Sequence, residues 1–216
     1  MKITKKILMA SLALYCSAAV FSQAVFSAET PRQILFKNVQ IFNGTSDKLI
    51  TGKDVLVEGN LIKSVGSGLA VAANVEVIDG GGRTLMPGLI ENHAHLMLMG
   101  PSLPAMEGMT TWEDFAIHGT KMAEMYLMQG FTTLRDAGGS NAGLQRAINA
   151  GTIIGPRLYP SAAFLGGRGG HADFANFTSL MGDATNFSRL NMAQEIDGVD
   201  DMLKAARNNF RMGQAS

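Results

Sequence analysis

Two histidines separated by a single residue carry the clearest chemical signal in the sequence. His93 and His95 close the segment 87–95, in which the apolar pair Leu89 and Ile90 predicts a short strand. Successive side chains of a strand point to opposite faces, so both imidazoles would lie on one side at its carboxyl end. Two imidazoles placed in this way can bind one divalent metal ion, and zinc suits such nitrogen ligands. The pair is therefore a candidate metal site, where a bound ion would generate hydroxide near neutral pH and polarise a carbonyl group, although a histidine pair of this spacing can also be purely structural.

Three further residues are candidates for a place in the site. Asp136 ends a second predicted strand and could line the site, although a salt bridge or a loop cap is the commoner role for such a residue. Arg168 could bind a substrate carboxylate. His171 follows the glycine run 166–170 and could reach a substrate, or it could be exposed to solvent in a loop. The glycine run lacks the Lys-Ser/Thr pair of a phosphate-binding loop, so phosphate binding is not expected.

Residues 29–86 are predicted to form a small β-sandwich. Apolar residues alternate in several short runs, from Ile34 to Leu85. Turn residues separate these runs at positions 43–44, 58–60, 66–68 and 80–82. Short strands at this spacing are typical of a sandwich or a meander.

Residues 87–216 alternate between predicted strands and helices. Strands are expected near 89–90, at 131–136 and at 157–161, and helices after a capping box of Thr110 and Glu113, at 141–150 and over the last apolar stripe, Val199, Met202, Leu203, Ala206 and Phe210. Such alternation implies parallel βα units. A closed (β/α)₈ (TIM) barrel takes about 250 residues, so only three units fit here. The predicted fold class is α/β, a partial TIM barrel preceded by a small β-sandwich domain.

The first 28 residues resemble a secretory signal peptide. Lys2, Lys5 and Lys6 precede an apolar core that is shorter than the roughly 20 residues of a membrane helix. Small residues allow cleavage after Ala24, Ser27 or Ala28. We expect an exported protein, periplasmic or secreted, without a stable membrane anchor after cleavage. Cys16 is the only cysteine, so the mature chain would contain no disulfide.

The charge pattern argues against nucleic-acid binding. Lysine and arginine together number 18, as do aspartate and glutamate, and no block of one sign stands out. Nucleic-acid binding requires a clustered basic surface. Nucleic-acid binding is therefore not expected.

Four motifs in chain order strengthen the metal interpretation, since a His-x-His pair alone is weak evidence. They are residues 87–90 with His93 and His95, residues 132–139, Gly155-Pro156-Arg157, and Gly169-Gly170-His171. With these motifs the chain resembles the amidohydrolase superfamily, in its imidazolonepropionase-like and Xaa-Pro dipeptidase-like branch. The β-rich stretch resembles that family's small composite sandwich domain. The resemblance implies a hydrolase of amide-like C–N bonds that uses one or two divalent ions and acts on small-molecule or dipeptide-like substrates.

The resemblance also implies residues for which this sequence has no position. Such enzymes add a carboxylated lysine from the fourth strand, two histidines from the fifth and sixth, and an aspartate from the eighth that acts as general base. We therefore expect an N-terminal fragment that contains no catalytic base, is inactive alone, and leaves the inner faces of its helices partly uncovered. The alternative is a truncated, catalytically inactive secreted protein with at most residual metal binding. The substrate, the metal and the oligomeric state stay open.

Overall fold

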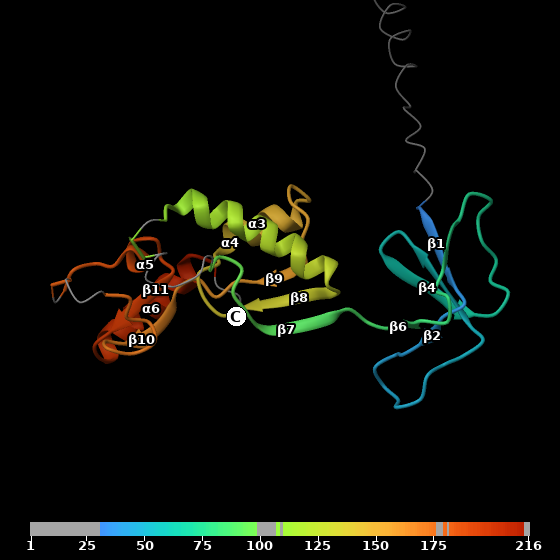
Figure 1. Ribbon diagram of the computed structural model, residues 1–216, viewed down its shortest axis with the longest axis horizontal. Coiled ribbons are helices and arrows are strands. Elements are labelled where there is room, and N and C mark those ends of the chain that lie inside the picture. Colours follow the sequence, from blue (N-terminus) through green and yellow to red (C-terminus); the bar gives the residue numbers. More distant parts are fainter. Residues whose placement is uncertain (1–30, 99–106, 109, 176–178, 181, 214–216) are drawn as a thin grey trace, which may run out of the picture. The chain divides into compact units, whose positions relative to one another are not determined.

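The structure is a computed structural model that describes residues 31–98, 107–108, 110–175, 179–180 and 182–213. The expected signal peptide, residues 1–28, lies outside these ranges. The chain divides into two compact units, Met1–Met86 and Pro87–Ser216 (Figure 1). No helix within the described ranges is long and apolar enough to cross a membrane.

The first unit is built from short strands, as the alternating pattern predicts. The strands are β1 (Gln33–Lys37), β2 (Gln40–Ile41), β3 (Asp54–Glu58), β4 (Leu61–Gly66), β5 (Glu76–Asp79) and β6 (Thr84–Leu85). Four of them form a sheet in the order β4-β3-β1-β5, with β1 antiparallel to β3 and parallel to β5. The other two, β2 and β6, pair in parallel. Val39, Ile41 and Val55 form the buried core, against which Phe36 and Leu85 pack.

The second unit is a mixed α/β structure. Its elements are β7 (Leu89–Ala94), α3 (Trp112–Met128), β8 (Phe131–Asp136), α4 (Ala142–Asn149), β9 (Arg157–Tyr159), β10 (Phe164–Gly167), α5 (Asn186–Arg189), β11 (Ala193–Ile196) and α6 (Val199–Arg211). Strands β7, β8 and β9 lie side by side in chain order and are parallel (Figure 1). Helix α3 contacts β8, and α4 contacts β9. This arrangement puts the carboxyl ends of three parallel strands at one edge, where the histidine pair is expected.

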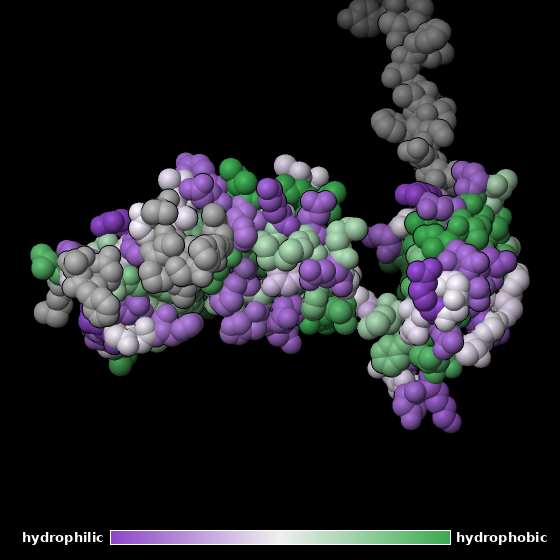
Figure 2. Space-filling model, viewed as in Figure 1, coloured by the Kyte–Doolittle hydropathy of each residue, from purple (hydrophilic) through white to green (hydrophobic). Residues whose placement is uncertain are grey.

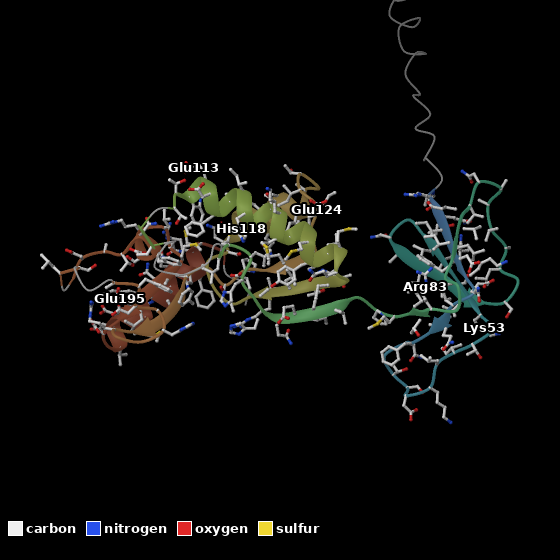
Figure 3. The ribbon with its side chains drawn as sticks, viewed as in Figure 1. Lys53, Arg83, Glu113, His118, Glu124 and Glu195 are labelled. Atoms are coloured by element: carbon white, nitrogen blue, oxygen red, sulfur yellow. The ribbon has the colours of Figure 1, made fainter. Side chains whose placement is uncertain are left out.

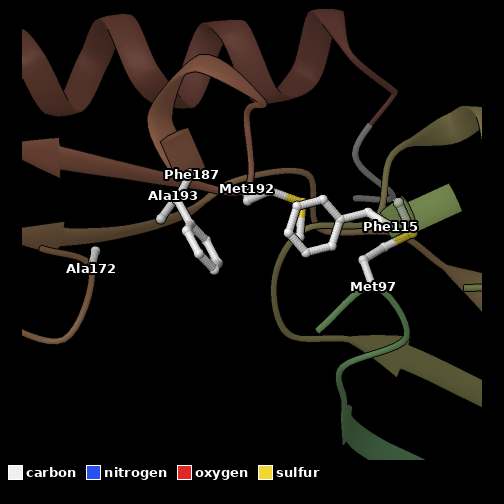
Figure 4. Close-up of a cluster of buried hydrophobic side chains, with 6 residues drawn as sticks. All are labelled: Met97, Phe115, Ala172, Phe187, Met192 and Ala193. Atoms are coloured by element: carbon white, nitrogen blue, oxygen red, sulfur yellow. The ribbon is translucent and has the colours of Figure 1, made fainter. Parts of the chain in front are cut away.

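Two apolar clusters hold the second unit together. Between the sheet and α3, the buried residues are Ala94, Leu96, Ala123, Leu134 and Leu158. The other cluster joins the segment after β7 to α3, α5 and β11, and its members are Met97, Phe115, Ala172, Phe187, Met192 and Ala193. Figure 4 shows the side chains of Met97, Phe115 and Met192 pointing toward one another. Burial of both clusters anchors the loops at the carboxyl ends of the strands.

Helix α3 begins one residue later than the sequence predicts. The capping box consists of Thr111 and Asp114, with the Thr111 amide donating to Asp114 Oδ2 at 2.9 Å. The predicted pair, Thr110 and Glu113, was wrong because both threonines have an acidic residue three positions later. On the face of α3 drawn in Figure 2, apolar residues lie between polar ones. Ile117 is one of the exposed apolar residues of this helix.

The parallel pair of β10 and β11 was not predicted. Strand β10 takes two residues from the glycine run that was expected to be a loop, Gly166 and Gly167. A Cβ at position 166 would lie 2.8 Å from the Ala172 Cβ and 3.1 Å from its amide nitrogen. Glycine therefore allows the following loop to fold back tightly against the strand.

Helix α6 has the predicted length, but its apolar stripe is not its buried face. Ala205 and Asn209 are the buried residues, and Asn209 Nδ2 donates to the Ala163 carbonyl at 2.7 Å. In contrast, Val199 is 77% exposed and Phe210 is 61% exposed. The helix is thus held partly by a polar contact, and the other described residues leave its apolar stripe uncovered.

Candidate metal site

His93 and His95 lie together at the carboxyl end of β7. His93 belongs to the strand and is exposed, whereas His95 directly follows the strand and is half-buried. Their ring centroids are 5.0 Å apart, and the ring planes meet at 76°. The segment is extended up to Ala94 and the two rings lie close together, a spacing compatible with two ligands of one ion.

One imidazole nitrogen of this pair is buried without a partner. His95 Nδ1 is enclosed by the protein and makes no hydrogen bond to any residue that the structure describes. Buried polar atoms are nearly always satisfied, so an orphaned nitrogen marks a place where a further group belongs. An imidazole nitrogen with a free lone pair is a metal donor, and the pair therefore fits a divalent ion as part of a ligand set.

The described residues do not complete that set. No group of three or more His, Cys, Asp or Glu side chains within the described ranges could hold a metal ion. The nearby carboxylate of Glu91 accepts a hydrogen bond from the His93 amide at 2.8 Å, within the same strand. Catalytic zinc sites usually have three protein ligands and a water. This part of the chain offers two candidates, His93 and His95.

Asp136, the last residue of β8, is fully buried and accepts four hydrogen bonds. Its Oδ2 accepts from the amides of Gly138 (3.0 Å) and Ser140 (3.1 Å) and from Ser161 Oγ (2.9 Å). Its Oδ1 accepts from the Leu96 amide at 3.4 Å. Burial raises the pKa of this carboxyl, and the hydrogen bonds partly offset that effect. Three of the four donors share Oδ2 and one reaches Oδ1, so this carboxylate connects the loops that follow β7, β8 and β9.

Sequence reasoning missed the partners of Asp136. Gly138 and Ser140 could have been found, because an aspartate before a Gly-rich turn commonly accepts from amides two or more residues later. Ser161 and Leu96 gave no signal, since they are distant in sequence from Asp136. Only the parallel order of the strands brings them together.

Backbone hydrogen bonds join the loops that follow β7, β8 and β9. The Ala137 amide donates to the Ala94 carbonyl at 2.7 Å. The Gly139 amide donates to the Ala162 carbonyl, and the Ala162 amide donates to the Ser140 carbonyl, both at 2.7 Å. The three strand ends therefore form one connected rim beside the histidine pair.

The two other candidate residues have partners of their own. Arg168 forms ion pairs with Glu195 and Asp197, each at 2.8 Å, and Asp197 raises the pKa of its guanidinium (Figure 3 labels Glu195). His171 is exposed, and its ring centroid lies 5.9 Å from that of Phe164. Within the described residues, no hydrogen bond, ion pair or ring contact connects either of them to the histidine pair.

Known proteins similar in sequence match only parts of the chain. No protein-family model matches it. A dihydroorotase of Trichlorobacter lovleyi is 41% identical over 81 residues, which is 38% of this chain and 16% of that enzyme. A 5-methylthioadenosine/S-adenosylhomocysteine deaminase of Caldanaerobacter subterraneus subsp. tengcongensis is 41% identical over 63 residues, which is 29% of this chain and 14% of that enzyme.

Solved structures match over most of the chain. An amidohydrolase is 30% identical with a TM-score of 0.69. A prolidase complexed with N-methylphosphonate-L-proline is 27% identical with a TM-score of 0.73, and a Xaa-Pro dipeptidase with bound methionine is 25% identical with a TM-score of 0.69. Each match covers 84% of this chain and 45% of the other. The chain therefore spans less than half of the proteins it resembles, and these similarities support membership of the amidohydrolase superfamily.

Proposed function

We propose that this chain forms the N-terminal part of a metal-dependent hydrolase that cleaves C–N bonds of amides or peptides. The observation that carries the proposal is the histidine pair, whose rings converge to 5.0 Å at the carboxyl end of β7. In parallel α/β barrels, active sites are built at that end of the strands. The similarity to solved amidohydrolases supports the same assignment.

In this proposal, His93 and His95 hold one divalent ion, and zinc is the metal that fits their nitrogen donors. When bound, such an ion lowers the pKa of a coordinated water and polarises the substrate carbonyl. Strands β7, β8 and β9 are the first three strands of a (β/α)₈ barrel, and the first unit belongs to a β-sandwich. Asp136 and the rim hold the loops of the site in place.

The proposed substrates are small molecules of the dipeptide type. The prolidase and the Xaa-Pro dipeptidase among the solved relatives support an Xaa-Pro peptide. The dihydroorotase match makes cyclic amides the alternative within the same reaction class. Arg168 and His171 remain candidates for substrate contact. Arg168 would have to exchange one of its carboxylate partners for that of the substrate.

A second candidate is a catalytically inactive exported protein that retains weak metal binding. The observation that favours it is the absence of a third ligand among the residues that the structure describes. Two imidazoles alone would bind a metal weakly and would leave it without a general base.

The test compares two proteins, the 216-residue chain and the product of the reading frame continued past codon 216. Bound metal is measured by mass spectrometry, and hydrolysis is assayed with Xaa-Pro dipeptides, N-acyl amino acids and dihydroorotate. We expect metal-dependent hydrolysis only in the longer product, with both metal and activity lost in His93→Asn and His95→Asn. His118→Asn, which changes a half-buried histidine of α3, is the matched control (Figure 3).

Two results would decide against this function. A stop codon directly after codon 216 would favour the inactive protein. Full metal content in both histidine variants of the longer product would refute the metal site itself.

Export is also a proposal. We propose that residues 1–28 direct the chain out of the cytoplasm and are then removed. Expression in a Gram-negative host, followed by N-terminal mass spectrometry of the periplasmic protein, should show a chain that begins after Ala24, Ser27 or Ala28. Recovery of the chain only with an intact Met1 would contradict export.

A further inference from the structure

The backbone around His95 is held from both sides by β8. On the preceding side, the Ala94 carbonyl accepts from the Ala137 amide at 2.7 Å. On the following side, the Leu96 amide donates to Asp136 Oδ1 at 3.4 Å. The two partners are consecutive, Asp136 being the last residue of β8 and Ala137 the next residue, so one short segment fixes the peptide groups that flank the histidine.

The carboxylate of Asp136 is itself fixed by groups outside β7. Oδ2 accepts from two amides of the loop after β8, those of Gly138 and Ser140, and from the hydroxyl of Ser161 after β9. The side chain is fully buried. Three good hydrogen bonds on one oxygen hold the other oxygen toward the Leu96 amide. The position of that amide is thereby tied to the neighbouring two strands.

We infer that Asp136 is a positioning residue for the histidine pair: it holds the peptide after His95 so that the two imidazoles converge. This inference rests on the metal site proposed above. Asp136 is not a ligand in this arrangement, because both of its oxygens accept from protein donors and the side chain is closed to solvent. Its role is to reduce the conformational freedom of a ligand, which is how supporting groups around metal sites raise affinity.

Asp136→Asn is the direct test, because it keeps the size of the side chain and removes acceptor capacity. Co²⁺ is titrated into the purified 216-residue chain. The visible absorption of the bound ion reports ligand geometry as well as affinity. We expect a loss of affinity of about 10- to 100-fold, the range typical of groups that support metal ligands, and an altered spectrum. Circular dichroism checks that the variant keeps its secondary structure.

Asp173→Asn is the matched control. Asp173 also closes a loop, accepting from the Gly169 amide at 2.8 Å and the Ala175 amide at 2.9 Å. Loss of a loop-closing carboxylate at this position should leave the Co²⁺ affinity and spectrum unchanged. If Asp173→Asn weakens Co²⁺ binding as much as Asp136→Asn, the effect is general destabilisation and the inference is wrong.

Ser161→Ala keeps the test decisive if Asp136→Asn does not fold. It removes one donor that orients the carboxylate and leaves both Asp136 and β7 unchanged. A loss of Co²⁺ affinity beyond experimental error supports the inference, and wild-type affinity and spectrum overturn it. His93→Asn and His95→Asn separate the two proposals: if they bind Co²⁺ like the wild type, the metal site fails, and if they lose it while Asp136→Asn does not, only the positioning role fails.

Discussion

Gly88 lies directly against the side chain of Thr132, where the chain enters β7 beside the start of β8. The Leu89 amide donates to the Gly130 carbonyl at 2.8 Å, which fixes this approach. A Cβ at position 88 would overlap Oγ1, Cγ2 and Cβ of Thr132. Glycine is required here because there is no space for a side chain. This close contact also sets how β7, the strand that leads to the histidine pair, lies against β8.

We expect Gly88→Ala to lower the free energy of unfolding by about 1–3 kcal/mol, as overpacking of a close contact does. Urea denaturation measures the change. Thr132→Ala in the same chain should restore most of the loss, because it removes the overlapping atoms. An additive double variant, with no recovery, would show that the contact is not the cause.

The buried leucines of the parallel strands should contribute strongly to stability. Leu134 of β8 is fully buried and Leu158 of β9 is 1% exposed. We expect Leu134→Ala to cost about 2–5 kcal/mol, through lost burial and the cavity left behind. Ile154, which is 62% exposed, provides the control, and Ile154→Ala should change stability by less than about 0.5 kcal/mol. Equal effects of the two substitutions would mean that the core is not packed as described.

Asp173 should make stability depend on pH in the acid range. The amides of Gly169 and Ala175 lower the pKa of this carboxyl below its usual value. A folded pKa below the unfolded one means that Asp173 stabilises the fold above the unfolded pKa, and that this contribution is lost as the pH falls through the folded pKa. Asp173→Asn should therefore be less stable than the wild type at pH 7, with the difference shrinking below about pH 4. A difference in urea midpoint that is constant with pH would exclude this origin.

The uncovered stripe of α6 should tolerate charge in this chain. Met202 is 44% exposed and Phe210 is 61% exposed, whereas Ala205 is 7% exposed. We expect Met202→Lys and Phe210→Lys to change stability by less than about 0.5 kcal/mol and to reduce self-association, because exposed apolar patches promote it. Light scattering and urea unfolding test this. Ala205→Lys should unfold the helix from the sheet, and a mild effect there would mean that the faces are assigned wrongly.

Sequence patterns predicted the elements whose residues show a clear periodicity along the chain. Strands β7 and β8, helices α4 and α6, and the juxtaposition of His93 and His95 follow from periodicity and from the alternation of side chains along a strand. The exact start of α3 did not follow, because Thr110 and Thr111 both fit the capping pattern.

Contacts between distant segments were beyond such patterns. Strand β11 contains Gln194 and Glu195 and has no apolar alternation, so only its pairing with β10 defines it. The carboxylate of Glu107 accepts from the amides of Asn186 and Phe187, across about eighty positions of sequence. The Leu96 and Ser161 donors of Asp136 are another case. Each depends on the tertiary arrangement of the strands, which local propensity does not encode.

The rim beside the histidine pair is closed mainly by peptide groups, through the bonds of Ala137 to Ala94 and of Gly139 and Ser140 to Ala162. Peptide groups are the same whatever side chain a position carries. Outside Gly139 and Ala162, whose left-handed backbones restrict the side chain, the residues displayed along this edge can therefore change while the platform that presents them keeps its shape.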